Sequence, residues 1–455
     1  MTSPPPTSAG EPTLARRLGA FDATMIVMGG IIGAGIFVNP SVVARQVHTF
    51  GLVLGAWVIG GAIALVGAFV YAELAVLRPR VGGQYAYLRD AYHPMVAFLY
   101  GWTLLLVTQT GGMAGAAIIF GRYFRELTGT GMPEQAVAAL TLGILTIVNC
   151  LGVRAGSNVQ SALMLTKIAA IVLLIGVGLF AAPASPALTS GTPASSGGFV
   201  GLATAMVPVL FAYGGWQTAS FVSGEMREPR RDLPRGLLVG VVGVVVLYLA
   251  VTFVCLRVLG VGGLAATATP ASQLMRIALG DRGARLIALG IAVSTVGFLS
   301  QSVLTAPRVY YAMARDGVFF KAVGKLDPRS RVPVVAIVLQ GVWAAIIALS
   351  GKYDQILNYV VSIDVLFFGL TGASLIVFRV RERRGVEPVE PGVRVPLHPV
   401  STGIFVLACW SISVTTIVQY PTNAGIGVGI LLLGVFVYQF WSKRGRPVEI
   451  ESAVP

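Results

Sequence analysis

The sequence predicts an all-α integral membrane protein with twelve transmembrane helices. Hydrophobic residues make up 55% of its 455 residues and charged residues only 11%, and the mean hydropathy is +0.79. This composition does not supply enough polar surface to coat a soluble globule of this length. The apolar residues also gather into stretches of about 20, which is the length of helix that crosses a bilayer.

Twelve such stretches follow one another along the chain. The predicted spans are 20–46, 51–77, 95–125, 135–152, 158–182, 199–224, 236–260, 284–314, 332–350, 353–380, 399–420 and 423–441. The connections between them are too short to form a soluble domain that could hold an active site. Any functional site must therefore lie among the membrane helices.

The distribution of basic residues predicts the orientation. Lysine and arginine are about three times as frequent in the connections on one side as on the other. Because cytoplasmic loops are enriched in these residues, both termini are expected in the cytoplasm, with the chain in the plasma or inner membrane. The net charge of +14 then needs no nucleic-acid partner, since the basic residues lie between apolar spans rather than on one helix or tail.

Two of the predicted spans contain interruptions. The first holds MGGIIGAGIFVNP, with a cluster of glycines between Gly29 and Gly35, and the sixth holds PVLFAYGGWQTAS, interrupted by Pro208 and by Gly214 and Gly215. Glycine costs roughly 1 kcal/mol relative to alanine in a helix interior, and membrane helices also use it for close packing. Broken helices at matching positions in two halves indicate instead a transporter site near the bilayer midplane. Free N–H groups at such breaks suit an anion such as a carboxylate.

Motifs in and around these spans resemble the amino acid–polyamine–organocation (APC) superfamily, and are most similar to its L-type amino-acid transporter branch. In chain order they are IIGAGIFVNP, ELAVLRPRVGGQYAYLRDAY, FLYGW, FAYGGW, EMREPRRDLPRG and YAMARDG. The resemblance runs from about residue 20 to 440. It implies a leucine-transporter-type 5+5 inverted repeat, formed by spans one to five and six to ten, with two accessory helices.

The domain organisation follows from this resemblance. The predicted parts are a disordered cytoplasmic tail (1–18), the first five-helix repeat (19–182), an external linker (183–198), the second, inverted five-helix repeat (199–380), the accessory helices (381–441) and a cytoplasmic tail (442–455).

The resemblance also implies how a substrate amino acid would bind at the two breaks. The N–H groups of Gly33, Ala34 and Gly35 would hold its α-carboxylate, and carbonyls of Ile31 or Ile32 and of the segment 211–214 would hold its α-amino group. Phe211 matches the aromatic residue that covers the substrate, and Ala34 stands where the family often has serine. The predicted substrate-binding residues are Ile31, Ile32, Gly33, Ala34, Gly35, Phe211, Ala212, Tyr213, Gly214, Gly215 and Trp216.

Two ionisable residues within the spans are candidates for ion coupling, because a charge near the bilayer midplane is costly. Lys167 in span five matches a lysine that in related transporters replaces a sodium ion and bridges the backbones of spans one and eight. It could also carry a coupled proton or snorkel to the interface. Asp364 in span ten is the second candidate, with a bond to a neighbouring helix as its alternative. If sodium were used, hydroxyls of span eight such as Ser300, Ser302 and Thr305 are candidate ligands.

Together these features predict a sodium-independent secondary transporter of neutral L-amino acids, either an exchanger or a proton-coupled symporter. Neutral substrates are favoured because the segments around the breaks contain no Asp, Glu or Arg. A cationic amino-acid or polyamine transporter of the same superfamily and a sodium-coupled symporter are the alternatives. An enzyme is disfavoured, since the three histidines lie near span ends and neither GxSxG nor HExxH occurs.

No cofactor or metal site is expected, because the three cysteines lie in apolar runs without zinc spacing. The expected partners are an amino-acid substrate, the lipid bilayer and, for symport, protons. The loop RYFRELTGTGMPEQ between spans three and four lacks the cysteine that joins animal members of the family to an ancillary subunit. A disulfide-linked partner is therefore not expected.

Overall fold

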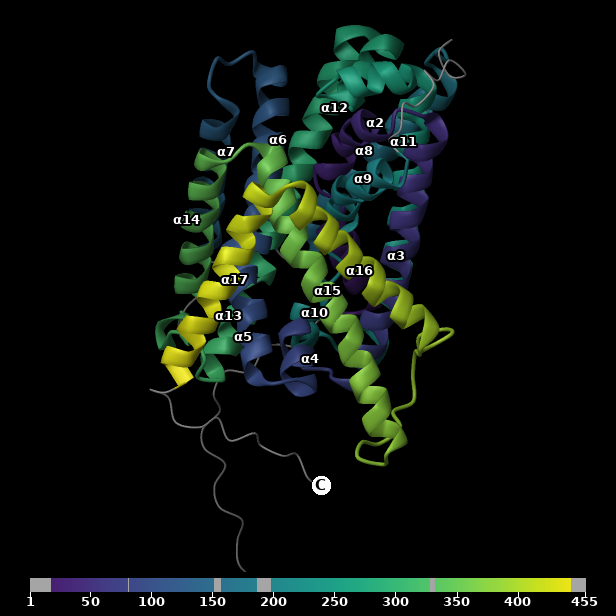
Figure 1. Cartoon of the computed structure of the whole chain (residues 1–455). Helices are drawn as coiled ribbons and strands as arrows, with labels where there is room; N and C mark the ends of the chain where they lie inside the picture. Colours follow the sequence, from purple (N-terminus) through teal and green to yellow (C-terminus); the bar gives the residue numbers. More distant parts are fainter. Residues whose placement is uncertain (1–17, 81, 151–156, 186–197, 328–331, 443–455) are drawn as a thin grey trace, which may run out of the picture.

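The computed structural model describes residues 18–80, 82–150, 157–185, 198–327 and 332–442 (Figure 1). Within these ranges the chain is helical and contains no β-strand, only an isolated bridge between Leu18 and Met226. The fold is therefore all-α, as the sequence predicts.

The helices of the first half include both long apolar segments and short ones. They are α1 (Ala20–Ile31), α2 (Asn39–Val47), α3 (Phe50–Leu77), α4 (Gln84–Ala91), α5 (Pro94–Thr103), α6 (Gln109–Thr128), α7 (Glu134–Cys150) and α8 (Ser157–Phe180). The 3-10 helix η1 (Gly35–Phe37) precedes α2, and the π-helix η2 (Leu104–Thr108) joins α5 to α6.

The second half continues in the same way. Its α-helices are α9 (Gly198–Tyr213), α10 (Thr218–Phe221), α11 (Pro229–Ala266), α12 (Pro270–Thr305), α13 (Pro307–Arg315), α14 (Val334–Ser350), α15 (Tyr353–Arg383), α16 (Val400–Gln419) and α17 (Pro421–Ser442). Two short 3-10 helices, η4 (Ser223–Glu225) and η5 (Lys321–Gly324), follow α10 and α13.

The apolar helices make this a multi-pass membrane protein. Among the described residues, seven helical segments are long and apolar enough to cross a bilayer, and five further apolar helices have 10–17 residues. The shorter ones fall within other predicted spans, but their length alone does not establish that each crosses. The count of twelve, the inverted repeat and the domain boundaries therefore stay predictions.

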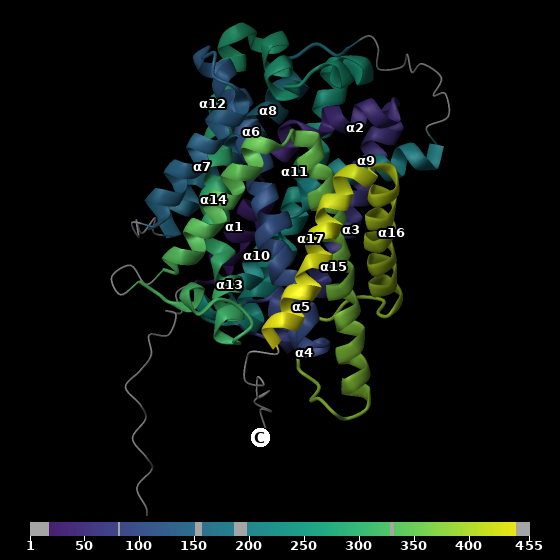
Figure 2. The ribbon, with the colours of Figure 1, turned by 60° about the vertical axis from the view of Figure 1, so that its left-hand side comes forward.

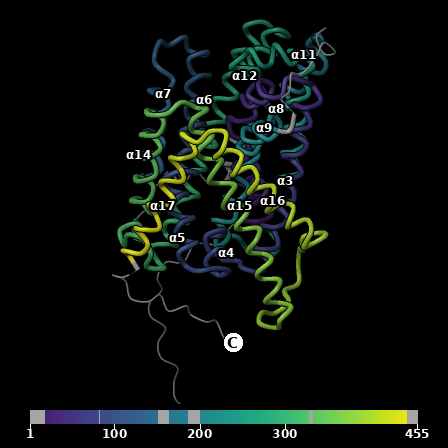
Figure 3. Tube along the Cα trace, viewed as in Figure 1, coloured from purple at the N-terminus to yellow at the C-terminus, as the bar shows by residue number. Residues whose placement is uncertain are grey.

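The long helices stand side by side around two broken ones. In Figures 1 and 3, α6, α7, α14 and α17 lie on one side and α3, α8, α9 and α11 on the other, with α15 and α16 in front. Turning the molecule brings α1 and α10 into view within the bundle (Figure 2). Helix α1 packs against α11, and α11 packs against α3. This arrangement buries α1 from Met28 to Ile31, at the point where it stops.

Both interruptions predicted from the sequence are present. Helix α1 ends at Ile31, where the backbone leaves helical geometry at Ile32 (ψ 85°) before η1 begins. Helix α9 ends at Tyr213, and a turn over residues 214–217 separates it from α10. The predicted first and sixth spans are thus each divided into two helical pieces.

Pro208 does not interrupt the sixth span, contrary to the prediction. It lies inside α9, which continues as a helix for another turn and a half. A proline removes one backbone N–H, and a buried membrane helix tolerates this when neighbouring groups satisfy the freed atoms. Here the carbonyl of Pro208 accepts a 2.7 Å hydrogen bond from Asn39 Nδ2. The break lies at Gly214 and Gly215 alone.

Candidate functional site

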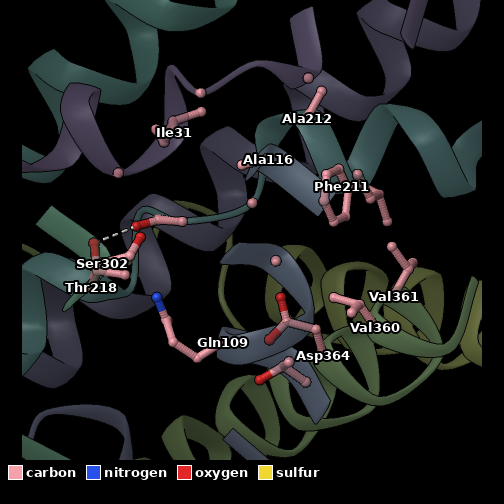
Figure 4. Close-up of a pocket in the computed structure, with 18 of the residues that line it drawn as sticks. Ile31, Gln109, Ala116, Phe211, Ala212, Thr218, Ser302, Val360, Val361 and Asp364 are labelled. Atoms are coloured by element: carbon pink, nitrogen blue, oxygen red, sulfur yellow. Dashed lines mark hydrogen bonds between the residues drawn. The ribbon is translucent and has the colours of Figure 1, made fainter. Parts of the chain in front are cut away.

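The two breaks meet at a cavity of about 790 Å³, part of which is open to solvent. Residues of the α1 break and of the turn after α9 form one part of its wall, and α6, α12 and α15 supply the rest (Figure 4). The cavity therefore lies where the sequence predicts a transporter site, between the interrupted helices.

Two glycines allow the broken helices to approach at backbone distance. A Cβ atom on Gly215, which has φ +113°, would lie 2.1 Å from the carbonyl oxygen of Gly30. A Cβ on Gly30 would lie 2.7 Å from the carbonyl oxygen of Gly215 and 2.6 Å from Thr218 Oγ1. Real Cβ atoms do not come so close, and a positive φ also favours glycine. Close backbone contact is thus the structural reason for these two glycines.

The break after α1 leaves backbone donors at the cavity. The N–H of Gly33 is used, since it donates to the carbonyl of Ile31 at 2.8 Å. For Ala34 and Gly35, which also line the cavity, no backbone hydrogen bond from the N–H is found within the described chain. Ala34 is the N-cap of η1 and Gly35 its first residue, so they have the free donors and partial positive charge of a helix N-terminus.

The carbonyls of Ile31 and Ile32 at the α1 break already accept hydrogen bonds from the protein. This argues against their predicted role as acceptors for the α-amino group of a substrate. The carbonyl of Ile31 accepts from Tyr248 Oη at 2.9 Å as well as from Gly33 N–H. The carbonyl of Ile32 accepts from Lys167 Nζ at 3.1 Å, and Ile32 does not line the cavity, whereas Ile31 does.

At the end of α9, by contrast, a carbonyl loses its helical partner. The N–H of Gly215, which would bond the carbonyl of Phe211 in a continuous helix, donates instead to Gln217 Oε1 at 3.0 Å. Phe211, Ala212 and Gly214 all line the cavity. The last turn of α9 therefore presents the negative end of a helix dipole to the same space as the amides of α1.

Lys167 lies behind the α1 break rather than in the cavity. Its side chain is buried, and Nζ donates to the carbonyls of Ile32 (3.1 Å) and Gly29 (3.4 Å). Snorkelling is therefore wrong for this lysine. Its hydrogen bonds within the described chain all go to α1, so the predicted bridge to the backbone of span eight is not formed. In that span, the hydroxyl of Thr305 donates to its own helix at Gln301.

Phe211 lies on the other side of the cavity, next to a set of hydrogen bonds that joins three helices. Its ring meets Tyr353 edge-on, with centroids 6.1 Å apart. Tyr353 Oη donates to Oδ1 of the buried Asn39 at 2.8 Å, and Asn39 Nδ2 bonds the carbonyl of Pro208. One asparagine thus joins α2, α9 and α15. Asn39 was not among the predicted site residues, although an asparagine within an apolar span is a signal for such a role.

Tyr213 and Trp216 do not line the cavity, contrary to the prediction. Tyr213 packs among Trp57 and Tyr248 and donates to the carbonyl of Trp57 at 3.2 Å. Trp216 packs on Phe368, with ring centroids 4.8 Å apart. Both point away because successive residues around a helix end face different directions, so a position next to the break does not ensure contact with the cavity.

Polar residues outside the break segments also line the cavity. Thr108 and Gln109 come from the junction of η2 and α6, Ser302 from α12 and Asp364 from α15. The sequence predicts Asp364 only as a candidate for coupling, and Thr108 and Gln109 were not predicted. The signal in the sequence was the polar run Thr108–Gln109–Thr110 in an apolar span. Its first residue is the last of the π-helix η2, a feature frequent at functional sites. The break segments contain no acidic residue, but the cavity as a whole does contain one, Asp364.

Comparison with known proteins identifies the family. The model of the family described as "Amino acid permease" matches residues 18–438. The chain belongs to this family. It is 29% identical over 450 residues to the "b(0,+)-type amino acid transporter 1" of Homo sapiens, covering 96% of this chain and 91% of the relative. It is also 29% identical over 454 residues to the human "Large neutral amino acids transporter small subunit 2", covering 96% and 83%.

These findings confirm the resemblance to the APC superfamily and its L-type branch. The family and these relatives are transporters rather than enzymes, and the chain is an amino-acid permease. The cavity at the two breaks is accordingly the candidate site for an amino acid.

Proposed function

We propose that this permease carries L-α-amino acids by alternating access, without sodium and without a cofactor. The proposal is supported most by the backbone groups at the two breaks, which carry partial charges of opposite sign. Free amides of Ala34 and Gly35 and the carbonyl end of α9 line one cavity. A zwitterion needs a donor site for its carboxylate and an acceptor site for its ammonium group, and these backbone groups offer both.

In the proposed binding mode, the α-carboxylate accepts hydrogen bonds from Ala34 and Gly35. The α-ammonium group donates to the carbonyls of Phe211 and Ala212 at the end of α9, rather than to Ile31 or Ile32, whose carbonyls are engaged. Phe211 covers the bound molecule from the side of Tyr353. Gly30 and Gly215 keep the two breaks close enough for these contacts.

Neutral side chains suit the walls next to this backbone site. Ala116, Ile119, Val360 and Val361 are apolar and line the cavity. Burying a side chain of leucine size against such walls is favourable by roughly 1.5–3 kcal/mol. The human relative whose name specifies large neutral amino acids supports the same substrate class.

Sodium independence rests on Lys167. A fixed cation that donates to the carbonyls of Gly29 and Ile32 uses the acceptors that a bound sodium ion would need at the α1 break. We therefore favour an exchanger or a proton-coupled symporter. Lys167 is our first candidate for coupling. Asp364 is the second, and it differs because it lines the cavity.

We further propose that the protein lies in a cell membrane with both termini in the cytoplasm, as the basic connections indicate. The three cysteines, Cys150, Cys255 and Cys409, are free thiols within or at the end of membrane helices. The connection between α6 and α7 contains no cysteine. We therefore propose that the permease works without a disulfide-linked subunit.

Uptake of radiolabelled L-leucine into proteoliposomes tests this function. Vesicles are prepared with and without internal leucine, in sodium-free and in sodium-containing buffer, and an inward proton gradient is imposed separately. We expect uptake without sodium, driven either by internal amino acid or by the proton gradient. A strict sodium requirement would contradict the role of Lys167. No uptake of any amino acid, under any of these gradients, would contradict the proposed function itself.

A further inference from the structure

Three oxygen atoms surround an empty point beside Gly214, at the end of α9. Apart from atoms of the adjoining residues, the nearest neighbours of a Cβ placed on this glycine would be the carbonyl oxygens of Leu210 (3.2 Å) and Phe211 (3.5 Å) and Oδ2 of Asp364 (3.9 Å). Gly214 does not have a positive φ, so its backbone conformation alone does not require glycine. The missing side chain leaves a small space within the cavity that is lined by acceptors.

Two of these three acceptors have no donor in the described part of the chain. The carbonyl of Leu210 accepts from the N–H of Gly214 at 2.8 Å, as in a continuous helix. The carbonyl of Phe211 loses its helical partner, because the N–H of Gly215 donates to a side chain instead. Asp364 has neither a hydrogen bond nor an ion pair with another described residue. A carbonyl and a carboxylate are thus left to accept from whatever enters this space.

The carboxylate of Asp364 lacks a compensating cation. It is the one ionisable group among the described residues that line the cavity, and it projects from α15 into the open space (Figure 4). An unpaired charge in a membrane-embedded cavity is costly, so its partner must be a group that enters from the cavity. In the proposed binding mode, the α-ammonium group of the substrate reaches the end of α9. An ammonium group has three N–H donors, and its hydrogen bonds to a carboxylate are about twice as strong as those between neutral groups.

We propose that Asp364 binds the α-ammonium group of the substrate together with the carbonyl of Phe211, and that this carboxylate makes the permease select an α-amine. The inference rests on the proposed function and deepens it, since backbone carbonyls alone also accept from a neutral hydroxyl group. A molecule with an α-hydroxyl group leaves the charge of Asp364 uncompensated and adds the negative charge of its own carboxylate. The permease therefore distinguishes α-amino acids from α-hydroxy acids with the same side chain.

The test compares two ligands that differ only at this group. L-Leucine and L-2-hydroxy-4-methylpentanoic acid share the side chain and the carboxylate, so the ratio of their affinities reports the contact with the α-substituent alone. Both dissociation constants are measured by isothermal titration calorimetry on the purified full-length protein in detergent, in sodium-free buffer at neutral pH, with the weaker ligand measured by displacement.

The variants separate the charge from its surroundings. Asp364→Asn removes the charge at nearly constant size, and Asp364→Glu keeps it. Ser362→Ala is the control, because Ser362 lies on the same helix but outside the cavity, with its hydroxyl on the carbonyl of Tyr359. Unchanged gel-filtration profiles and thermal unfolding midpoints without ligand show that the variants are folded.

Wild type should bind leucine more than tenfold more tightly than the hydroxy acid. Asp364→Asn should weaken leucine binding at least tenfold and leave the hydroxy acid within threefold of its wild-type value, because only the amine loses a partner. Asp364→Glu should retain more of the preference for leucine than Asp364→Asn, and Ser362→Ala should retain all of it.

A second variant tests the space without changing Asp364. Gly214→Ala places a methyl group at the point that the three oxygens surround, and it should weaken leucine binding at least tenfold. Gly176→Ala is its control, because a Cβ there meets no atom within 4 Å. Leucine binding by Gly214→Ala at wild-type strength would show that the α-ammonium group does not occupy this space.

Three further results would overturn the inference. An equal loss of both ligands in Asp364→Asn would assign a structural role to the carboxylate. Unchanged binding of both ligands, with proton-driven leucine uptake into proteoliposomes lost, would assign it to coupling. Wild type that binds the hydroxy acid as tightly as leucine would show that no α-amine is selected, while the proposed function would stand. Wild type that neither binds nor takes up any amino acid would contradict the proposed function as well.

Discussion

Gly30 and Gly215 show at the residue scale why glycines recur in spans that are otherwise ready to cross a membrane. Each faces the other's carbonyl at a distance that excludes a Cβ atom. Gly35 is less tightly packed, since a Cβ atom added to it would lie 3.3 Å from Ala212 Cα. The glycines both free backbone groups and bring the two breaks together, so a single methyl group at this contact should separate them.

Gly215→Ala should therefore reduce leucine uptake in proteoliposomes at least tenfold, because its Cβ would collide with the backbone of Gly30 and its φ of +113° strains an alanine. Gly176→Ala is the matched control, since a Cβ there meets no atom within 4 Å. Uptake by Gly215→Ala at the wild-type rate would show that the backbone contact between the breaks is not needed for transport.

The cavity residues in the two breaks could be predicted from the sequence. For the residues that α6 and α15 contribute, the sequence did not predict that they line the cavity. A glycine-containing motif can be recognised within a single segment of the sequence. Such motifs, through their resemblance to the family, predict Gly33, Ala34, Gly35 and Phe211 as site residues. Gln109 and Asp364 reach the same cavity from helices far apart in the chain, and only packing brings them there. Without that packing, the sequence does not show that an acidic residue in span ten lines the cavity.

At the element scale, α8 stabilises the broken end of α1. Lys167 projects from α8 and donates to two carbonyls that have no helical partner, and Gln301 of α12 donates to the carbonyl of Ile26 at 2.7 Å. Hydropathy predicted apolar helices in these regions, because a span needs about 20 apolar residues. It began the eighth span at residue 284, whereas α12 begins at Pro270. It could not predict that Pro208 leaves α9 intact or that η2 is a π-helix, since both depend on neighbouring helices.

Lys167→Met should lower uptake at least tenfold in sodium-free buffer. The change leaves the carbonyls of Gly29 and Ile32 without a donor inside the protein, at a cost of about 1–3 kcal/mol for each unsatisfied group. Lys321→Met is the control, because Lys321 is exposed in η5. Unchanged uptake by Lys167→Met in the absence of sodium would exclude the lysine from transport and from its proposed place as a substitute for sodium.

At the scale of the whole molecule, contacts on both sides of the cavity hold the helices together. On one side Asn39 joins α2, α9 and α15. On the other, Arg308 of α13 pairs with Glu225 of η4 at 3.2 Å, and Arg89 of α4 pairs with Asp316, next to α13, at 2.7 Å. Alternating access requires that one set of contacts opens while the other stays closed. Both sets consist of a few hydrogen bonds or partly exposed ion pairs, which such a cycle can break and remake.

If the two breaks recognise both backbone groups of an amino acid, a molecule that lacks one of these groups should not compete for uptake. Uptake of radiolabelled L-leucine is measured with an excess of unlabelled L-leucine, 3-methylbutylamine, which lacks the carboxylate, or 4-methylpentanoic acid, which lacks the ammonium group. We expect that only L-leucine competes, because each analogue leaves one end of the site empty. Competition by either analogue as strong as that by leucine would contradict it.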